Sequence, residues 1–235
     1  MNTFKGPFRI IFEDLRLQFL IIGSITLFIY AFMVGLGYFL SVDEFSAAIF
    51  GPAYGLLAIY PFLLFTKSFR YNLAFGGTRK QFMAALYTNI LLYTVVFMVV
   101  LNVVYQFNEW LVARDIHSFT LIHTGMLLES NHMFLYFWID FIFGIFAFAL
   151  GLIINTIWHY IGTVKTLYLG AVVTIVMIFW YTFGDVMQVF QWIIGNRLSF
   201  MHVLLLVALL FLGVSYFLIK EGPIERGGHQ GKAEE

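Results

Sequence analysis

Six apolar stretches dominate this sequence, and each is long enough to cross a lipid bilayer as a helix. A helix needs about 20 apolar residues to span a hydrocarbon core of ~30 Å, and it satisfies its own backbone hydrogen bonds where water is absent. We place the spans at residues 18–40, 47–66, 81–105, 133–157, 163–183 and 200–220. The sequence therefore predicts an all-α integral membrane protein, with one six-helix transmembrane domain over 1–220 and a polar tail over 221–235.

The composition agrees with this class. Hydrophobic residues make up 61% of the 235 residues and charged residues 11%, which leaves too few polar side chains to cover a soluble surface. The formal net charge is zero, so no bulk positive field attracts nucleic acid. The sequence has no Cys, which excludes disulfides, thiolate metal sites and cysteine nucleophiles.

Positive charge predicts the orientation of the spans. All Lys and Arg residues except Arg114 and Arg197 fall on one side of the predicted spans. Cytoplasmic loops of membrane proteins carry the excess of Lys and Arg. We therefore expect both termini in the cytoplasm.

The first 20 residues have an amphipathic pattern of their own. Gly6 and Pro7 suit a helix start, because proline at the first helical position loses no needed hydrogen bond. Apolar residues then recur at helical spacing, namely Phe8, Ile11, Phe12, Leu15 and Phe19. The pattern predicts an interfacial amphipathic helix that turns into the first span, with an extended first span as the alternative.

Charge concentrates in the segment FRYNLAFGGTRKQF, residues 69–82, between the second and third spans. A short helix over 67–75 would place Phe69 and Leu73 on one side. Its other side would carry Lys67, Arg70, Tyr71 and Ala74. The alternative is an ordinary solvated loop whose cations only enforce topology.

The end of this segment has the pattern of a helix stop followed by a helix start. Gly76 and Gly77 would end the short helix. Thr78 and Gln81 form a T-x-x-Q capping box, which would satisfy the first free amides of the third span.

Asp140 is the one acidic residue clearly inside a predicted span, about two turns from its outer end. An ionised side chain at that depth is costly unless it has a partner. One interpretation is a substrate or gating role. The other is that Asp140 reaches outward or pairs with Arg114 or Arg197.

Small residues inside the spans predict close helix packing. The pairs are Ala31 with Gly35, Gly51 with Gly55, and Gly144 with Gly151. Pro61 should kink the second span.

Two segments outside the membrane are apolar. Residues 108–132 should hold helical pieces packed on the outer ends of the spans. His117, His123 and His132 lie there without a helical metal-ligand spacing, so we interpret them as solvated or headgroup-facing. Residues 184–200 predict a partly inserted, re-entrant element before the last span.

Motifs of catalysis and nucleotide binding are missing. The sequence has no G-x-x-x-x-G-K-[ST] phosphate loop and no H-E-x-x-H zinc motif. Ser215 has no histidine within the spans to act as its base. We therefore expect no catalytic residue, cofactor or metal in this chain.

These features together resemble the membrane subunits of ABC-2 type ATP-binding cassette exporters. The resemblance covers the whole chain as a pattern, and its most specific part is LAFGGTRK at residues 73–80. That motif is similar to the first cytoplasmic loop of permeases from Gram-positive bacteria that accompany ATPases for antimicrobial-peptide immunity and export. The chain departs from larger relatives by lacking a sizeable extracellular domain.

The resemblance implies a multi-pass subunit of the bacterial plasma membrane, paired with a second permease through Ala31 and Gly35. Separate ATPase subunits would bind ATP and Mg and dock on the helix at 67–75, the coupling helix. The residues implied in this coupling are Lys67, Phe69, Arg70, Tyr71, Leu73, Gly76, Gly77, Thr78, Arg79 and Lys80. The substrate would be hydrophobic or amphipathic, for example a membrane-active peptide. An intramembrane enzyme and a non-transporting assembly or sensor protein are the alternatives.

Overall fold

The computed structural model describes residues 4–39, 45–48, 50–65, 68–117, 119–128 and 132–222. Along the chain the elements are α1 (Lys5–Phe39), β1 (Phe45–Ala47), α2 (Gly51–Leu64), α3 (Ser68–Ala74), α4 (Arg79–Val112), β2 (Phe119–Leu121), the 3₁₀ helix η1 (Thr124–Leu128), α5 (Met133–Ile161), α6 (Thr163–Phe183), α7 (Val186–Gly195) and α8 (Arg197–Glu221).

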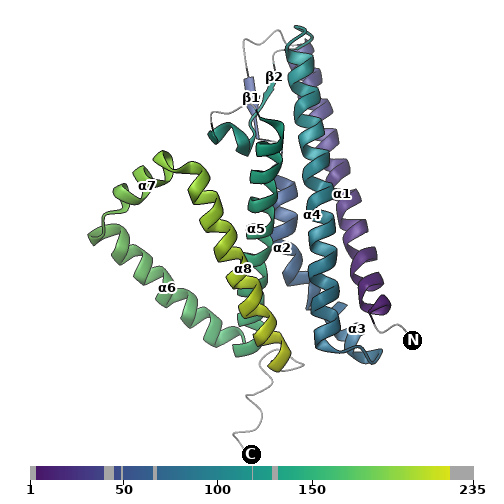
Figure 1. Cartoon of the computed structure of the whole chain (residues 1–235), viewed down its shortest axis with the longest axis vertical. Helices are drawn as coiled ribbons and strands as arrows, with labels where there is room; N and C mark the ends of the chain where they lie inside the picture. Colours follow the sequence, from purple (N-terminus) through teal and green to yellow (C-terminus); the bar gives the residue numbers. More distant parts are fainter. Residues whose placement is uncertain are drawn as a thin grey trace, which may run out of the picture.

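A bundle of long helices forms the body of the molecule (Figure 1). α5 lies at its centre and packs against α2 and α8, while α1 packs along α4. The start of α1, the short helix α3 and the end of α8 all lie at one end of the bundle (Figure 1). We call this the α3 end. The two cations predicted to face outward lie toward the opposite end, with Arg114 just after α4 and Arg197 as the first residue of α8.

Five helices among the described residues are long and apolar enough to cross a membrane, namely α1, α4, α5, α6 and α8. The second predicted span, 47–66, corresponds to α2, which has only 14 residues. At 1.5 Å per residue α2 is about 21 Å long, shorter than a hydrocarbon core of ~30 Å. Its start is later than predicted, at Gly51 and Pro52, because proline has no amide hydrogen to donate and favours the first turn of a helix.

α1 is one unbroken helix of 35 residues, or about 52 Å. Side chains of α4 hold its first turns, since Asn89 Nδ2 donates to the Phe8 carbonyl at 3.2 Å and Tyr93 donates to the Phe12 carbonyl at 3.0 Å. The first turns therefore continue along α4 and do not turn away from it (Figure 1). The predicted turn between an interfacial helix and the first span is wrong, and the extended first helix is what forms.

A short parallel pair of strands departs from the all-α prediction. β1 pairs with β2 in register, with Ser46 opposite Thr120. Asn108 of α4 donates to the Phe119 carbonyl at 3.1 Å and so holds β2 against the bundle. The segment after α4 thus packs on the helix ends, as predicted for 108–132, although part of it is extended.

α6 and α7 stand apart from the bundle. α6 leaves α5 at Gly162, whose φ of +82° is a conformation that glycine adopts readily. No residue of α6 or α7 is buried, and α7 joins the far ends of α6 and α8 (Figure 1). An apolar helix is therefore present before the last span, whereas its insertion into the membrane stays a prediction.

Glycines of α5 allow close packing of helices, as predicted for one of the three small-residue pairs. A Cβ added at Gly151 would lie 2.0 Å from the Ala58 carbonyl oxygen of α2, and one at Gly144 would lie 2.8 Å from Met98 Cε. At Gly51, Gly55 and Gly35 an added Cβ meets nothing within 4 Å, so these three glycines serve no close packing within the described chain.

Pro61 lies inside α2, where its missing amide leaves the helix one hydrogen bond short. Asn155 of α5 donates to the Pro61 carbonyl at 2.5 Å. The contact fixes α2 against α5 beside the proline. The kink predicted here stays a prediction.

Candidate functional site

Asp140 is fully buried, and its carboxylate accepts three hydrogen bonds and lies in contact with His123. Oδ1 accepts from the Tyr54 hydroxyl of α2 at 2.7 Å and from the Thr124 hydroxyl of η1. Oδ2 lies 2.8 Å from Asn102 Nδ2 of α4 and 2.8 Å from His123 Nε2. We call these five residues the Asp140 cluster. It joins α2, α4, α5 and the segment before η1.

The second nitrogen of His123 fixes where its proton lies. Nδ1 accepts a hydrogen bond from the Gly125 amide at 2.8 Å, so it carries no proton. The proton is then on Nε2, which lies beside Asp140 Oδ2 without a well-aligned hydrogen bond.

Aromatic rings enclose His123. Its ring stacks on Tyr136 at 4.8 Å between centroids and lies 4.7 Å from the Tyr105 ring, and Phe50 meets it edge-on at 5.9 Å. His123 is buried among these rings, with 2% of its surface exposed. The expectation that this histidine is solvated or headgroup-facing is wrong.

His117 is also buried, against the same expectation. Its Nδ1 accepts from the Phe119 amide at 3.1 Å, which orients the start of β2. Burial lowers the pKa of His117, so the neutral form is favoured near neutral pH. Among the described residues, no group of three or more potential metal ligands gathers.

The partners of Asp140 differ from those proposed on sequence grounds. Neither Arg114 nor Arg197 is among its contacts within the described residues. Arg114 lies over the Trp110 ring at 3.9 Å, and Arg197 Nε donates to the Ile194 carbonyl at 3.0 Å. One signal was available, because Asn102 is a polar residue in an apolar span at a depth similar to that of Asp140.

The second group of predicted site residues lies at the α3 end. The helix predicted over 67–75 is observed as α3, and Lys67 lies outside the described residues. Phe69 is buried, with its ring centroid 5.2 Å from Phe82 of α4 and 6.0 Å from His159 of α5. Leu73 is half-buried against the core. One side of α3 is therefore seated on the bundle.

The opposite side of α3 is open. Arg70 and Lys80 are exposed, Tyr71 is 54% exposed, and Phe75, just after the helix, is 81% exposed. Aromatic rings beside cations on one surface are typical of protein contacts. This surface is called the α3 surface below.

The stop and restart after α3 have the predicted geometry. Gly76 has a φ of +79°, and a Cβ added at Gly77 would lie 2.2 Å from Asn72 Oδ1. Thr78 accepts from the Gln81 amide at 3.3 Å while Gln81 Oε1 accepts from the Thr78 amide at 3.0 Å, which completes the capping box.

Arg79 makes a contact that no sequence pattern predicts. Its guanidinium donates to the Ile219 carbonyl at 3.4 Å, the Lys220 carbonyl at 3.2 Å and the Gly222 carbonyl. These are unpaired acceptors at the last turn of α8, where a cation also complements the helix dipole. Arg79 thus ties the start of α4 to the end of α8.

The residues predicted to pair two permeases lie on an outer side of α1. Ala31 is exposed and Gly35 has open space around it. Among the described residues, no atom lies within 4 Å of a Cβ added at Gly35.

Comparison of the chain with known protein families, characterised proteins and solved structures finds no match. The fold therefore defines only a class. Several long apolar helices indicate a multi-pass, helical membrane protein.

Proposed function

We propose that this chain is the membrane subunit of an ATP-driven ABC-2 type exporter in a bacterial plasma membrane. The observation that carries the proposal is α3, a short helix seated on the bundle by Phe69 with an exposed surface of Arg70, Tyr71 and Phe75. The resemblance of LAFGGTRK to the first cytoplasmic loop of such permeases concerns the same residues. A separate ATPase subunit, holding ATP and Mg, would bind the α3 surface.

The contacts of α3 supply a route for coupling. Phe69 contacts both α4 and α5, so a displacement of α3 would act on two helices of the bundle. Arg79 follows within the same segment and holds the end of α8. ATP-driven motion of α3 would then move α4, α5 and α8 together and reshape a path for a hydrophobic or amphipathic substrate.

A second permease, identical or homologous, would complete the path. The open position of Ala31 and Gly35 on α1 permits a helix to approach there, because small residues let backbones come close. The exposed, apolar α6 supplies a further surface for such a subunit or for lipid.

The experiment is recovery of the ATPase with the tagged chain from its native membrane. Arg70→Glu should reverse a contact in the α3 surface and weaken association by on the order of 2 kcal/mol, so ATPase recovery should fall. Lys165→Glu is the matched control, because Lys165 is an exposed cation at the start of α6 and lies outside the α3 surface. Equal ATPase recovery with both variants would contradict a role of α3 in docking.

Support for the enzyme alternative is weaker. His123 lies beside the buried carboxylate of Asp140, and the lone pair of its Nδ1 already accepts the Gly125 amide. A general base needs a free nitrogen within reach of a nucleophile. Activity of the purified chain without any partner would favour an enzyme over the exporter.

A further inference from the structure

Residues 119–128, which hold β2 and η1, lie at the end of the bundle opposite the α3 end (Figure 1). We call this segment the outer strap. β2 contacts α4 and α1, while η1 contacts α5 and α8. Phe119 and Leu121 of β2 are fully buried. The outer strap therefore joins four helices at that end.

Two buried histidines hold the outer strap by the same kind of hydrogen bond. His117 Nδ1 accepts from the Phe119 amide at 3.1 Å, and His123 Nδ1 accepts from the Gly125 amide at 2.8 Å. In each case the donor is the amide two residues later. A ring nitrogen of histidine accepts a hydrogen bond only while it carries no proton. Both bonds therefore depend on the neutral form of histidine.

The surroundings of His123 would tolerate a second proton. Its ring lies next to the rings of Tyr105 and Tyr136, and its Nε2 lies 2.8 Å from Asp140 Oδ2. A cationic His123 would thus have a carboxylate as its partner. Thr124, the next residue, also contacts Asp140 through its hydroxyl group. The η1 end of the strap would therefore stay attached to α5.

His117 has no such partner among the described residues. The described charged groups nearest to it along α4 and the following turn are Glu109, Arg114 and Asp115, and neither acid forms an ion pair with it. Its side chain is 6% exposed, and its Nε2 has no hydrogen-bond partner within the described chain. A second proton on His117 would break the bond to the Phe119 amide and leave a buried charge unpaired, which is unfavourable.

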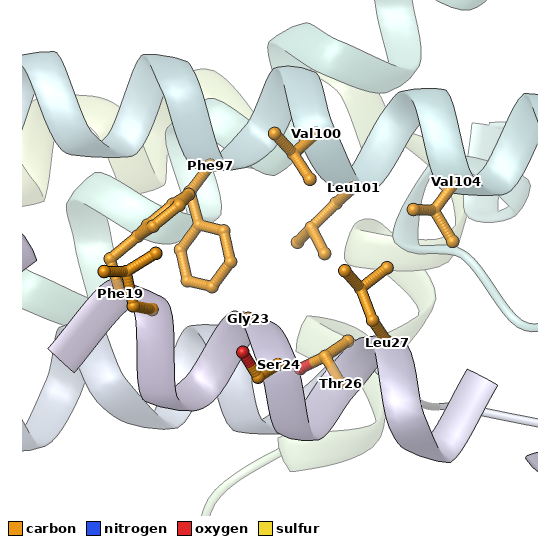
Figure 2. Close-up of a pocket in the computed structure, with 10 residues that line it drawn as sticks. Phe19, Gly23, Ser24, Thr26, Leu27, Phe97, Val100, Leu101 and Val104 are labelled. Atoms are coloured by element: carbon orange, nitrogen blue, oxygen red, sulfur yellow. The ribbon is translucent and has the colours of Figure 1, made fainter. Parts of the chain in front are cut away.

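The two helices beneath β2 do not pack tightly against each other. A groove separates α1 from α4, and Leu27 of α1 and Leu101 and Val104 of α4 line it (Figure 2). Asn108, one turn beyond Val104, donates to the Phe119 carbonyl at 3.1 Å. β2 therefore bridges α1 and α4 at the outer end of this groove.

We infer that the outer strap is an acid-sensitive closure whose sensor is His117. Protonation of His117 turns the acceptor of the Phe119 amide into a donor, so β2 leaves β1 and the bridge between α1 and α4 is lost. η1 stays in place, because His123 and Thr124 still contact Asp140. This inference goes beyond the proposed export function and does not depend on it.

The direction of the pH dependence follows from the neutral form. Burial lowers the pKa of His117 in the closed strap, whereas an exposed histidine has a pKa of about 6.5. The open strap therefore binds the proton more readily than the closed strap. Closure is fully stable above about pH 6.5, and below this value the ratio of open to closed strap rises by up to about tenfold per pH unit.

The test uses the full-length chain in detergent with two spin labels on the strand pair. Ser46 and Thr120 lie opposite each other, so labels attached through Ser46→Cys and Thr120→Cys should broaden each other's electron paramagnetic resonance spectrum at about pH 7.5. The sequence has no native Cys to compete for the label. At about pH 5 the broadening should disappear, whereas a single label through Met126→Cys in η1 should keep its mobility. Persistent broadening, or release of both sites together, would overturn the inference.

Two histidine variants identify the sensor. His117→Asn keeps an acceptor for the amide two residues later and does not titrate, so its strand pair should stay closed in acid. His132→Asn is the matched control, because His132 is an exposed histidine at the start of α5, outside the strap. The control should open like the unsubstituted chain. Opening of His117→Asn at the same pH as the control would assign the response to another group.

Nuclear magnetic resonance of the histidine rings gives a second measurement on the unsubstituted chain. The ring signal that is absent from His117→Asn belongs to His117. Its titration midpoint should coincide with the midpoint of strand opening, and it should lie below about 6.5. Two different midpoints would exclude His117 as the sensor, whatever the stability of the variant.

Discussion

His123 Nε2 lies 2.8 Å from Asp140 Oδ2, and this contact fastens the segment before η1 to the buried part of α5. The Thr124 hydroxyl, next in the chain, contacts the other carboxylate oxygen. Two consecutive residues of a surface connection are thus held by one buried acid. The acid serves as an attachment point for the outer segment, which favours a structural role of Asp140.

The first prediction concerns this acid. Asp140→Leu removes the acceptor of three hydrogen bonds and the partner of His123, and it should lower the free energy of unfolding by about 3 kcal/mol or more. Asp140→Asn should cost less, because its amide can face the Tyr54 and Thr124 hydroxyls, which can accept as well as donate. Thermal unfolding of the purified chain in detergent measures both.

Asp185→Asn is the control for these variants. Asp185 caps α7 through a contact with the Gln188 amide at 3.3 Å, and asparagine caps a helix equally well. The unfolding temperature of the Asp185→Asn variant should match that of the unsubstituted chain. An Asp140→Leu variant as stable as this control would refute the structural role.

The second prediction concerns the contact between α2 and α5. Gly151→Ala would place a methyl group against the Ala58 carbonyl, so the helices must separate at a cost of roughly 1–3 kcal/mol. Gly144→Ala should cost less, because its nearest neighbour is the flexible end of Met98. Gly55→Ala, in open space, should be neutral or stabilising. Equal stability of the three variants would contradict this packing.

The third prediction concerns the turn after α3. Gly76→Val should strain the turn by about 1–2 kcal/mol, because a β-branched residue resists a φ of +79°. Gly76→Asn should be tolerated, since asparagine adopts that conformation more readily. Hydrogen exchange of the amides of α3 measures the difference, and equally fast exchange in both variants would argue against a conformational cause.

The fourth prediction concerns orientation, and the lack of native Cys allows single-cysteine labelling in an unmodified background. A membrane-impermeant maleimide added to whole cells should label Arg114→Cys but not Arg70→Cys. Both side chains are exposed, so differences in burial do not explain the result. External labelling of Arg70→Cys would reverse the orientation and remove α3 from reach of a cytoplasmic ATPase.

Sequence patterns that act within a few residues correctly predicted the local structure after α3. Gly76, Thr78 and Gln81 act through hydrogen bonds and torsions within a few residues, so their sequence determines their geometry. Asp140 shows the opposite case. Its partners Tyr54 and His123 come from distant segments, and no local rule relates them. The contact of Arg79 with the end of α8 could not be predicted either, because Arg79 and Ile219 are far apart in the sequence.

The separation of α6 from the bundle affects how the protein is made. A helix without buried residues gains little from packing within the described chain, so its entry into the membrane depends mainly on its own sequence. Near its centre, a new charge would cost about 2.5–3.5 kcal/mol during insertion, with no neighbouring helix to compensate. Selection on α6 therefore acts at biogenesis, whereas selection on α5 acts on the finished fold.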